Sequence, residues 1–166
     1  MKRFGVMILV FIILTPVSIW GQKETDTFRG IKWGTDINEL PDLAVVAESG
    51  NVKTCSRKGE QNKIGDAEID GIRYQFYKER FCGVSIGFNE NRNFRLLKEG
   101  LLEKYGPGSK PNRYLEKYNW ILGDLWIILN FSEIQKKGTI YYYYNPISKE
   151  MIRDEKEAGR KAKDDL

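Results

Sequence analysis

Apolar and polar residues alternate over two neighbouring stretches of the chain, 72–77 and 82–88, which predicts two half-buried β-strands. The first stretch places Ile72, Tyr74 and Phe76 on one face. The second places four apolar residues on one face: Cys82, Val84, Ile86 and Phe88. Because only a short connection separates the two stretches, we expect them to pair as an antiparallel hairpin.

The spacing of apolar residues then lengthens to that of an amphipathic α-helix. The apolar stripe of this helix consists of Phe94, Leu97, Leu101 and Tyr105. We expect Asn91 or Asn93 to cap its N-terminus, and Gly106 followed by Pro107 to end it. Gly100 lies inside the helix, where glycine costs about 1 kcal/mol relative to alanine, so we expect it to mark close packing of the helix backbone against the sheet.

Shorter patterns complete the set of predicted elements. Thr35 or Asp36 begins a short helix that Pro41 ends, with Asp36 and Glu39 as a capping box. Further strands are predicted over residues 43–47, 52–57, 114–122, 125–131 and 139–145. The predicted fold class is therefore α+β, with an antiparallel sheet of about six strands, one main packed helix, a short N-terminal helix and a charged C-terminal helical tail.

The N-terminus has the layout of a secretory signal peptide, residues 1–21. Lys2 and Arg3 precede an uncharged, mostly apolar run over residues 4–14, and Gly21 is the predicted last residue before the cut. Cleavage makes the protein an exported one, periplasmic or extracellular, with no stable membrane insertion after removal of the signal. The alternative that stays open is an uncleaved anchor, although polar residues and a proline at 15–18 interrupt the segment and a spanning helix needs about 20 mainly apolar residues.

The rest of the chain divides by composition. Residues 22–27 are polar and are predicted to form a disordered lead-in, and residues 28–146 are predicted to form a single α+β domain. Residues 147–166 are mostly charged and are predicted to form a helical tail. A thin apolar stripe runs along that tail: Ile147, Met151, Ala158 and Ala162. The pattern favours a solvated helix, and the alternative is a helix that binds a partner.

Composition narrows the possible chemistry. The chain contains no histidine, which is the commonest general base and metal ligand. Its formal net charge is +4 with charges of both signs intermixed, unlike the basic patch of a nucleic-acid binder. Asp66, Glu68 and Asp70 alternate as residues on one strand face would, but their spacing does not fit a calcium loop and a solvated edge explains them. We therefore expect no nucleic-acid partner, and we assign no catalytic residue, cofactor or metal site.

Cys55 and Cys82 are the only cysteines, and a pair of cysteines in an exported protein is a candidate disulfide. Strand parity places Cys82 with Val84 on the core face, but it places Cys55 with Lys53 and Arg57 on a polar face. Opposite faces would keep the Cα atoms beyond the separation of about 7 Å that a bridge allows. Two alternatives follow. The two cysteines form a disulfide, or they remain thiols, with one buried and one exposed.

Four consecutive tyrosines occupy residues 141–144. On a strand, Tyr142 and Tyr144 would face inward, and Tyr141 and Tyr143 would face outward. Two exposed aromatic rings can stack on a sugar or contact a protein. The alternative is an ordinary strand built from good strand formers.

Two tryptophans flank the predicted turn at Gly123 and Asp124. Trp120 precedes the turn and Trp126 follows it, so the two indoles could pair across the hairpin. We expect both to serve the core.

Several segments together carry a resemblance. The segment FRGIKWGT at 28–35 follows a signal peptide, and it is joined by IRYQFY at 72–77, by a helix ending in Tyr105-Gly106-Pro107 and by a charged tail ending in KDDL. This combination resembles a group of small exported bacterial proteins of uncharacterised function, over most of the mature chain. The resemblance implies export and supplies no activity or site residues. The order of a helix and then a meander is also similar to the small outer-membrane assembly lipoprotein and β-lactamase-inhibitor fold group, which implies a fold and not a function.

The sequence therefore predicts a non-catalytic exported envelope protein that binds another envelope protein through sheet aromatics, the tail helix or both. The competing hypothesis is a small-ligand or glycan-binding module that uses Tyr141 and Tyr143. An enzyme that works through carboxylates is the third hypothesis.

Overall fold

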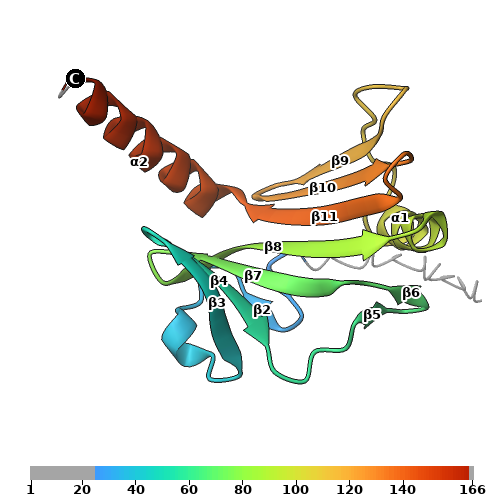
Figure 1. Ribbon diagram of the computed structural model, residues 1–166, viewed down its shortest axis with the longest axis horizontal. Coiled ribbons are helices and arrows are strands. Elements are labelled where there is room, and N and C mark those ends of the chain that lie inside the picture. Colours follow the sequence, from blue (N-terminus) through green and yellow to red (C-terminus); the bar gives the residue numbers. More distant parts are fainter. Residues whose placement is uncertain (1–24, 165–166) are drawn as a thin grey trace, which may run out of the picture.

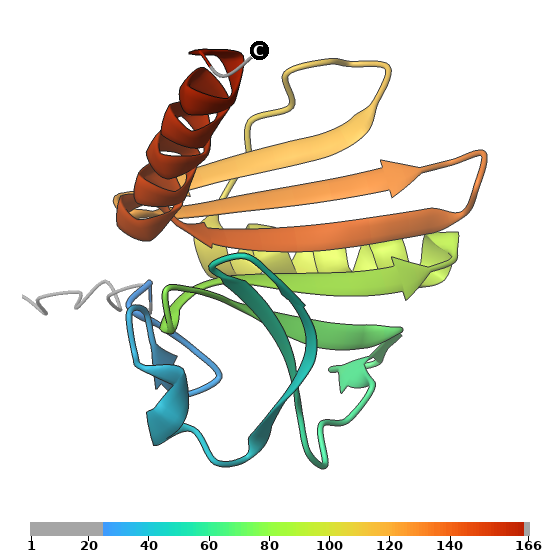
Figure 2. The ribbon, with the colours of Figure 1, turned by 60° about the vertical axis from the view of Figure 1, so that its left-hand side comes forward.

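The computed structural model describes residues 25–164. The predicted signal peptide, its cleavage or retention, residues 22–24 of the lead-in and the last two residues of the tail lie outside the described residues. Figure 1 shows a curved sheet, a helix α1 (Asn91–Tyr105) against the sheet, and a helix α2 (Asn145–Asp164) that extends away from one end of it. In Figure 2, α1 lies behind the sheet and α2 stands at its left-hand end.

The main sheet has seven strands in the spatial order β3-β4-β7-β8-β11-β10-β9, and every neighbouring pair is antiparallel. Their bounds are β3 Leu43–Ser49, β4 Val52–Arg57, β7 Gly71–Tyr77, β8 Arg80–Asn89, β9 Glu116–Leu122, β10 Leu125–Ser132 and β11 Lys137–Tyr144. This arrangement confirms the predicted α+β class and its large antiparallel sheet. The sheet is slightly larger than the sequence estimate of about six strands.

Short elements lie at the ends of the sheet. They are the two hairpins β1 (Thr27–Phe28) with β2 (Ile31–Lys32) and β5 (Lys63–Ile64) with β6 (Ala67–Glu68), and the 3-10 turn η1 (Ile37–Glu39). Asp36 caps η1 by accepting a hydrogen bond from the backbone N–H of Asn38 at 2.8 Å. The side-chain cap therefore forms with Asn38 and not with the predicted partner Glu39.

The N-terminus of α1 is held by a buried asparagine and not by a cap. Glu90 occupies the cap position without a side-chain cap bond, so the predicted capping role of Asn91 or Asn93 is wrong. Asn93 lies in the first turn, where its Oδ1 accepts from the Glu68 N–H at 3.1 Å and its Nδ2 donates to the Asn89 carbonyl at 2.9 Å. These bonds satisfy a buried amide, as burial requires, and they fix α1 against β6 and the end of β8.

The core lies between α1 and the inner face of the sheet. Its fully buried side chains include Tyr74, Phe76, Phe81, Ile86, Phe88, Ile127, Leu129 and Ile140. Burying one such side chain contributes about 1.5–3 kcal/mol, so this cluster dominates the stability of the domain. The C-terminal end of α1 is the predicted one, because the Gly106 N–H donates to the Leu102 carbonyl at 2.8 Å.

Trp33 closes one end of this core. Its indole stacks on Phe81 with ring centroids 4.6 Å apart, and it lies parallel to Tyr144 at 6.1 Å. Its Nε1–H donates to the Thr25 carbonyl at 2.8 Å. The described end of the predicted lead-in is thus tied to the core, and β1 begins at Thr27, the last residue of that segment.

Candidate functional site

Tyr141 and Tyr143 lie on the outer face of the sheet, which is the face opposite α1. Their cross-strand partners are Ile128 and Trp126 on β10 and Ser85 and Gly83 on β8. The two tyrosine rings are parallel to within 13°, with centroids 5.8 Å apart, and both side chains are half-buried. Tyr142 and Tyr144 point the other way, toward the core.

These tyrosines belong to a larger apolar area that we name the outer-face patch: Ile121, Trp126, Ile128, Tyr141 and Tyr143. Strand pairing places Ile121 opposite Trp126 and Trp126 opposite Tyr143, so the patch is continuous across β9, β10 and β11. Ile121 is 69% exposed and Trp126 is 39% exposed. Large contiguous apolar patches on a protein surface are typical of interaction sites, so the outer-face patch is the candidate site.

The two tryptophans beside the turn do not share a face. Trp126 pairs with Ile121 on the outer face, whereas Trp120 pairs with Ile127 and is 3% exposed in the core. The Trp120 Nε1–H donates to the Gly106 carbonyl at 2.8 Å, which holds the loop after α1 against the sheet. The expectation that Trp120 and Trp126 pair across the turn is therefore wrong. Trp126 is paired with Ile121, the residue next to Trp120, and successive residues of a strand point to opposite faces of the sheet.

Tyr141 stands between two shallow hollows of about 360 and 320 Å³. The first hollow is lined by residues of β9, β10 and β11, including Lys117 and Lys137. The second is lined by Arg73, Asp70 and the residues Ser85 and Gly87 of β8. The Tyr141 ring thus lies between two hollows, each of which is lined in part by charged side chains. Burial raises the pKa of Tyr143, so its phenol stays protonated at neutral pH and can donate a hydrogen bond to a bound group.

Helix α2 is attached to the body by an acidic face. Asp154 accepts from the Lys78 ammonium at 2.6 Å and from the Tyr77 hydroxyl at 2.8 Å, and Glu150 accepts from Arg80 at 2.6 Å. The hydrogen bond from Lys78 lowers the pKa of Asp154, and the bonds from Arg80 and then Lys78 lower the pKa of Glu150. The acidic face of α2 is therefore engaged with the turn between β7 and β8.

A small apolar cluster lies under the same helix turns. Ile147 is buried with Tyr77 and Cys82, and Met151 packs against them. The turn between β7 and β8, which contacts α2 through Lys78, consists of Lys78 and Glu79. Both residues have positive φ, at 48° and 65°. Such a two-residue turn has the backbone geometry that favours tight hairpins, and here it is formed without glycine or asparagine.

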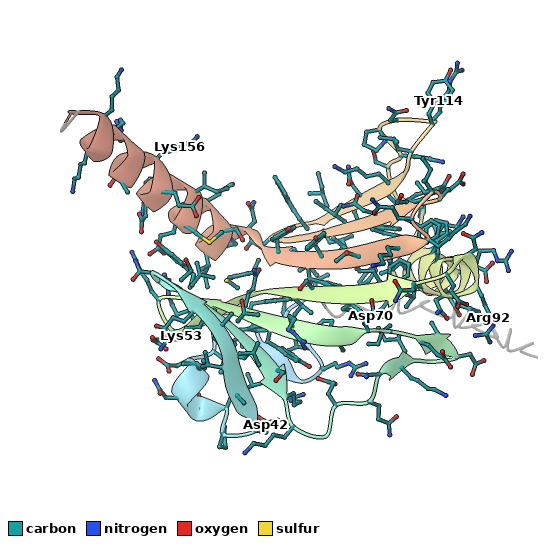
Figure 3. The ribbon with its side chains drawn as sticks, viewed as in Figure 1. Asp42, Lys53, Asp70, Arg92, Tyr114 and Lys156 are labelled. Atoms are coloured by element: carbon teal, nitrogen blue, oxygen red, sulfur yellow. The ribbon has the colours of Figure 1, made fainter. Side chains whose placement is uncertain are left out.

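The opposite face of α2 is basic. Lys149, Arg153, Lys156 and Arg160 line this side together with the half-exposed Ile152. Figure 3 shows Lys156 on the side of the helix that faces away from the turn between β7 and β8. Oppositely charged neighbours in the sequence, such as Lys149 and Glu150, thus lie on two different faces. The acidic face is paired with the body, and the basic face is open apart from the contact of Arg153 with Asp154 at 3.6 Å.

The carboxylates singled out in the sequence do not share one strand face. Asp66 lies in the turn between β5 and β6, Glu68 ends β6, and Asp70 lies before β7 and accepts from the Asn89 amide at 2.5 Å. Within residues 25–164, no group of three or more acidic or cysteine side chains is arranged to hold a metal ion. Asp66 and Glu68 take part in the local hydrogen bonding through their backbone groups, which contact Arg92 and Asn93.

Both cysteines are free and buried, in separate clusters. Cys55 is 0% exposed in the main core, since the face it shares with Lys53 and Arg57 is the core face and not the predicted polar face. Cys82 lies in a β-bulge opposite Gln75 and Phe76, which turns it away from Val84 and onto the α2 side. Burial raises the pKa of Cys82 to about 12 and also raises the pKa of Cys55, so both are poor nucleophiles.

Comparisons with known proteins add no relative. No family model, no curated protein and no solved structure matches this chain. In the described part of the chain, no helix is both long enough and apolar enough to span a membrane.

Sequence reasoning identified two residues of the patch and missed the other three. Trp126 and Ile128 lie in a stretch that is apolar on both faces, so parity alone could not assign them to the outside. Ile121 lies in an alternating stretch, where its parity is opposite to that of Trp120 and agrees with its outward position. The attachment of α2 was also missed. A usable signal was present, because Glu150 and Asp154 are one helical turn apart, as are Lys149 and Arg153, which defines one acidic and one basic face.

Proposed function

We propose that this chain is a non-catalytic exported protein whose outer-face patch binds another envelope protein. The supporting observation is the continuity of the patch, which joins aromatic and aliphatic side chains across three strands and is not covered by any described element. Protein interfaces combine an apolar, aromatic centre with a polar rim, and the patch has this composition.

The charges around the patch favour an acidic rim on the partner. Lys117, Lys137 and Arg73 are exposed beside it, and within the described residues none of them forms an ion pair. The open basic face of α2 has the same sign. We infer a partner with an apolar centre and carboxylates at its edge, since complementary charge raises association rates and excludes wrong partners.

A glycan is the alternative ligand for the same surface, and the parallel rings of Tyr141 and Tyr143 favour it. The aliphatic neighbours argue for a protein, because Ile121 and Ile128 offer no hydrogen bonds to sugar hydroxyls. The resemblance to small exported bacterial proteins stays a prediction and is compatible with either ligand.

The test is chemical crosslinking of the tagged full-length protein in its native cells, followed by mass spectrometry. We expect a stoichiometric partner that is lost when Tyr141→Ala is combined with Tyr143→Ala. Tyr114→Ala is the matched control, because Tyr114 is a 78% exposed tyrosine on the loop before β9, at the other end of the molecule from α2 (Figure 3). The melting temperature of both variants shows whether the domain is intact.

Equal recovery of the partner with the double variant and with the control would show that the outer-face patch is not the binding surface. A rise in melting temperature with cell-wall oligosaccharides, abolished by the double variant, would replace the protein partner with a glycan, since a ligand of the native state stabilises it.

A further inference from the structure

A cavity of about 540 Å³ lies between α1 and the inner face of the sheet, on the side opposite the outer-face patch. Residues 96–105 of α1 form one wall, and β8 and β11 form the floor. The β1–β2 hairpin and the turn between β5 and β6 border the remaining sides. Its volume lies within the range of about 300–1,000 Å³ that small-molecule sites occupy.

The interior of the cavity is apolar. Ile86 and Ile140 on the floor are each 1% exposed, and Leu97 and Leu101 from α1 are 5% and 6% exposed. Tyr142 lies beside them, with its ring centroid 5.1 Å from that of Phe28. A hydrocarbon that enters this space is removed from water on several sides, at a gain of about 0.8 kcal/mol for each buried CH₂ group.

The surroundings of Gly100 show that the helix backbone does not pack closely against the sheet at this point. The sequence predicted close backbone packing here, and this is wrong, because a Cβ built on Gly100 meets no atom within 4 Å. Gly100 lines the cavity from the helix side. Gly100 is exposed at the edge of the cavity, so a larger side chain at this position has room to extend over the cavity without displacing the core.

The charged groups that line the cavity differ in whether they have a partner of opposite charge. Arg29 forms an ion pair with Glu60, which also accepts from the Tyr74 hydroxyl at 2.5 Å. Lys104 lies 5.3 Å from the centroid of the Tyr105 ring and forms no ion pair within the described range. Asp66 lines the cavity from the β5–β6 turn. Asp66 lies beside the first turn of α1, where its backbone carbonyl accepts from Arg92 at 3.1 Å, whereas Lys104 lies in the last turn. An anionic ligand group can therefore approach Lys104 at the end of the cavity remote from Asp66.

We propose that this cavity binds an amphipathic monocarboxylate, with its hydrocarbon chain against Ile86, Leu97 and Ile140 and its carboxylate at Lys104. This site is independent of the outer-face patch, because the two lie on opposite faces of the sheet. Failure of either proposal leaves the other standing.

The test is calorimetric titration of the protein, expressed from its full coding sequence, with decanoate and with 1-decanol. We expect decanoate to bind at least fivefold more tightly than the alcohol. Lys104→Gln should reduce that preference to less than twofold, and Arg95→Gln, an exposed cation on α1 that does not line the cavity, should leave it unchanged. Gly100→Phe should weaken decanoate binding at least tenfold without lowering the melting temperature, and Gly100→Ala should bind within twofold of the parent.

Three results would overturn the proposal. They are the absence of decanoate binding, equal binding of decanoate and decanol by the parent protein, and undiminished binding by folded Gly100→Phe. The last result would show that the fatty chain associates with another surface, such as the outer-face patch.

Discussion

The indole of Trp126 on β10 is the cross-strand neighbour of the Tyr143 side chain on β11, on the sheet face that neither α1 nor α2 covers. A few residues away along the chain, Trp120 has the opposite orientation and is buried in the core. The same residue type thus serves stability on one face and, in our proposal, recognition on the other.

Substitution of the two tryptophans should separate these roles. We expect Trp120→Ala to lower the free energy of unfolding by about 3–5 kcal/mol, as removal of a buried tryptophan does. Trp126→Ala should cost about 1 kcal/mol or less, the contribution of a cross-strand pair. Urea unfolding of both variants measures the difference, and comparable losses would show that Trp126 is part of the core.

This orientation of the tryptophans marks the limit of what the sequence could predict. Alternation over 72–77 and the helical spacing over 94–105 were sufficient for the elements and the α+β class, because one face of each element is clearly apolar. The stretch 125–131 is apolar on both faces, so its outer side could be recognised only when the structure showed which face α1 covers.

Cys82 shows a second limit. Strict alternation assigns it to the face of Val84, but a bulge opposite Gln75 and Phe76 inserts one extra residue and reverses its direction. Local sequence contains no clear signal for that bulge.

Cys55 was misassigned because Lys53 and Arg57 on the same face were taken as evidence of a polar surface. In the structure these two residues lie at the edge of the core, paired with Glu79 and Asp42.

Thiol reactivity checks the placement of both cysteines. Because burial raises the pKa of each thiol, we expect neither Cys55 nor Cys82 to react with a maleimide in the folded protein at neutral pH. Both should react in denaturant without a reductant, which adds two labels to the intact mass. A mass without labels under those conditions would instead show a disulfide.

Two glycine substitutions should change stability in opposite directions. A Cβ on Gly138 would lie 2.5 Å from Cε2 of Phe88 and 2.8 Å from the Asn130 carbonyl, so Gly138→Ala should destabilise the protein by about 1–3 kcal/mol through overpacking. Gly100→Ala should stabilise it by up to about 1 kcal/mol through helix propensity. Thermal unfolding measures both, and a stabilised Gly138→Ala would contradict the close approach of β11 to Phe88.

The attachment of α2 should depend on pH. The folded-state pKa values of Glu150 and Asp154 are lowered from ordinary values of 4.5 and 3.8, so their contribution is complete above about pH 5 and is lost as the pH falls through the lowered values. The groups that face them from the body are Lys78, Arg80 and Tyr77. The protection of the α2 amides against exchange, expressed relative to the intrinsic rate at each pH, should therefore fall in acid and in high salt, which screens exposed charges.

The control for this pH dependence uses neutral side chains of the same shape. Glu150→Gln combined with Asp154→Asn should give low protection in α2 already at neutral pH and remove most of the acid dependence of that protection. Glu157→Gln, an exposed residue of the same helix, should behave like the parent protein. An acid dependence that persists in the double variant would point to other groups.

The most direct test of the proposed function is site-specific photocrosslinking in native cells. A p-benzoylphenylalanine at Trp126, in the outer-face patch, is compared with the same group at Tyr114, which is more exposed but lies outside the patch. We predict one discrete protein adduct from position 126 and none from position 114. Adducts of equal yield from both positions, or an adduct from position 114 alone, would contradict the assignment of the outer-face patch as the binding surface.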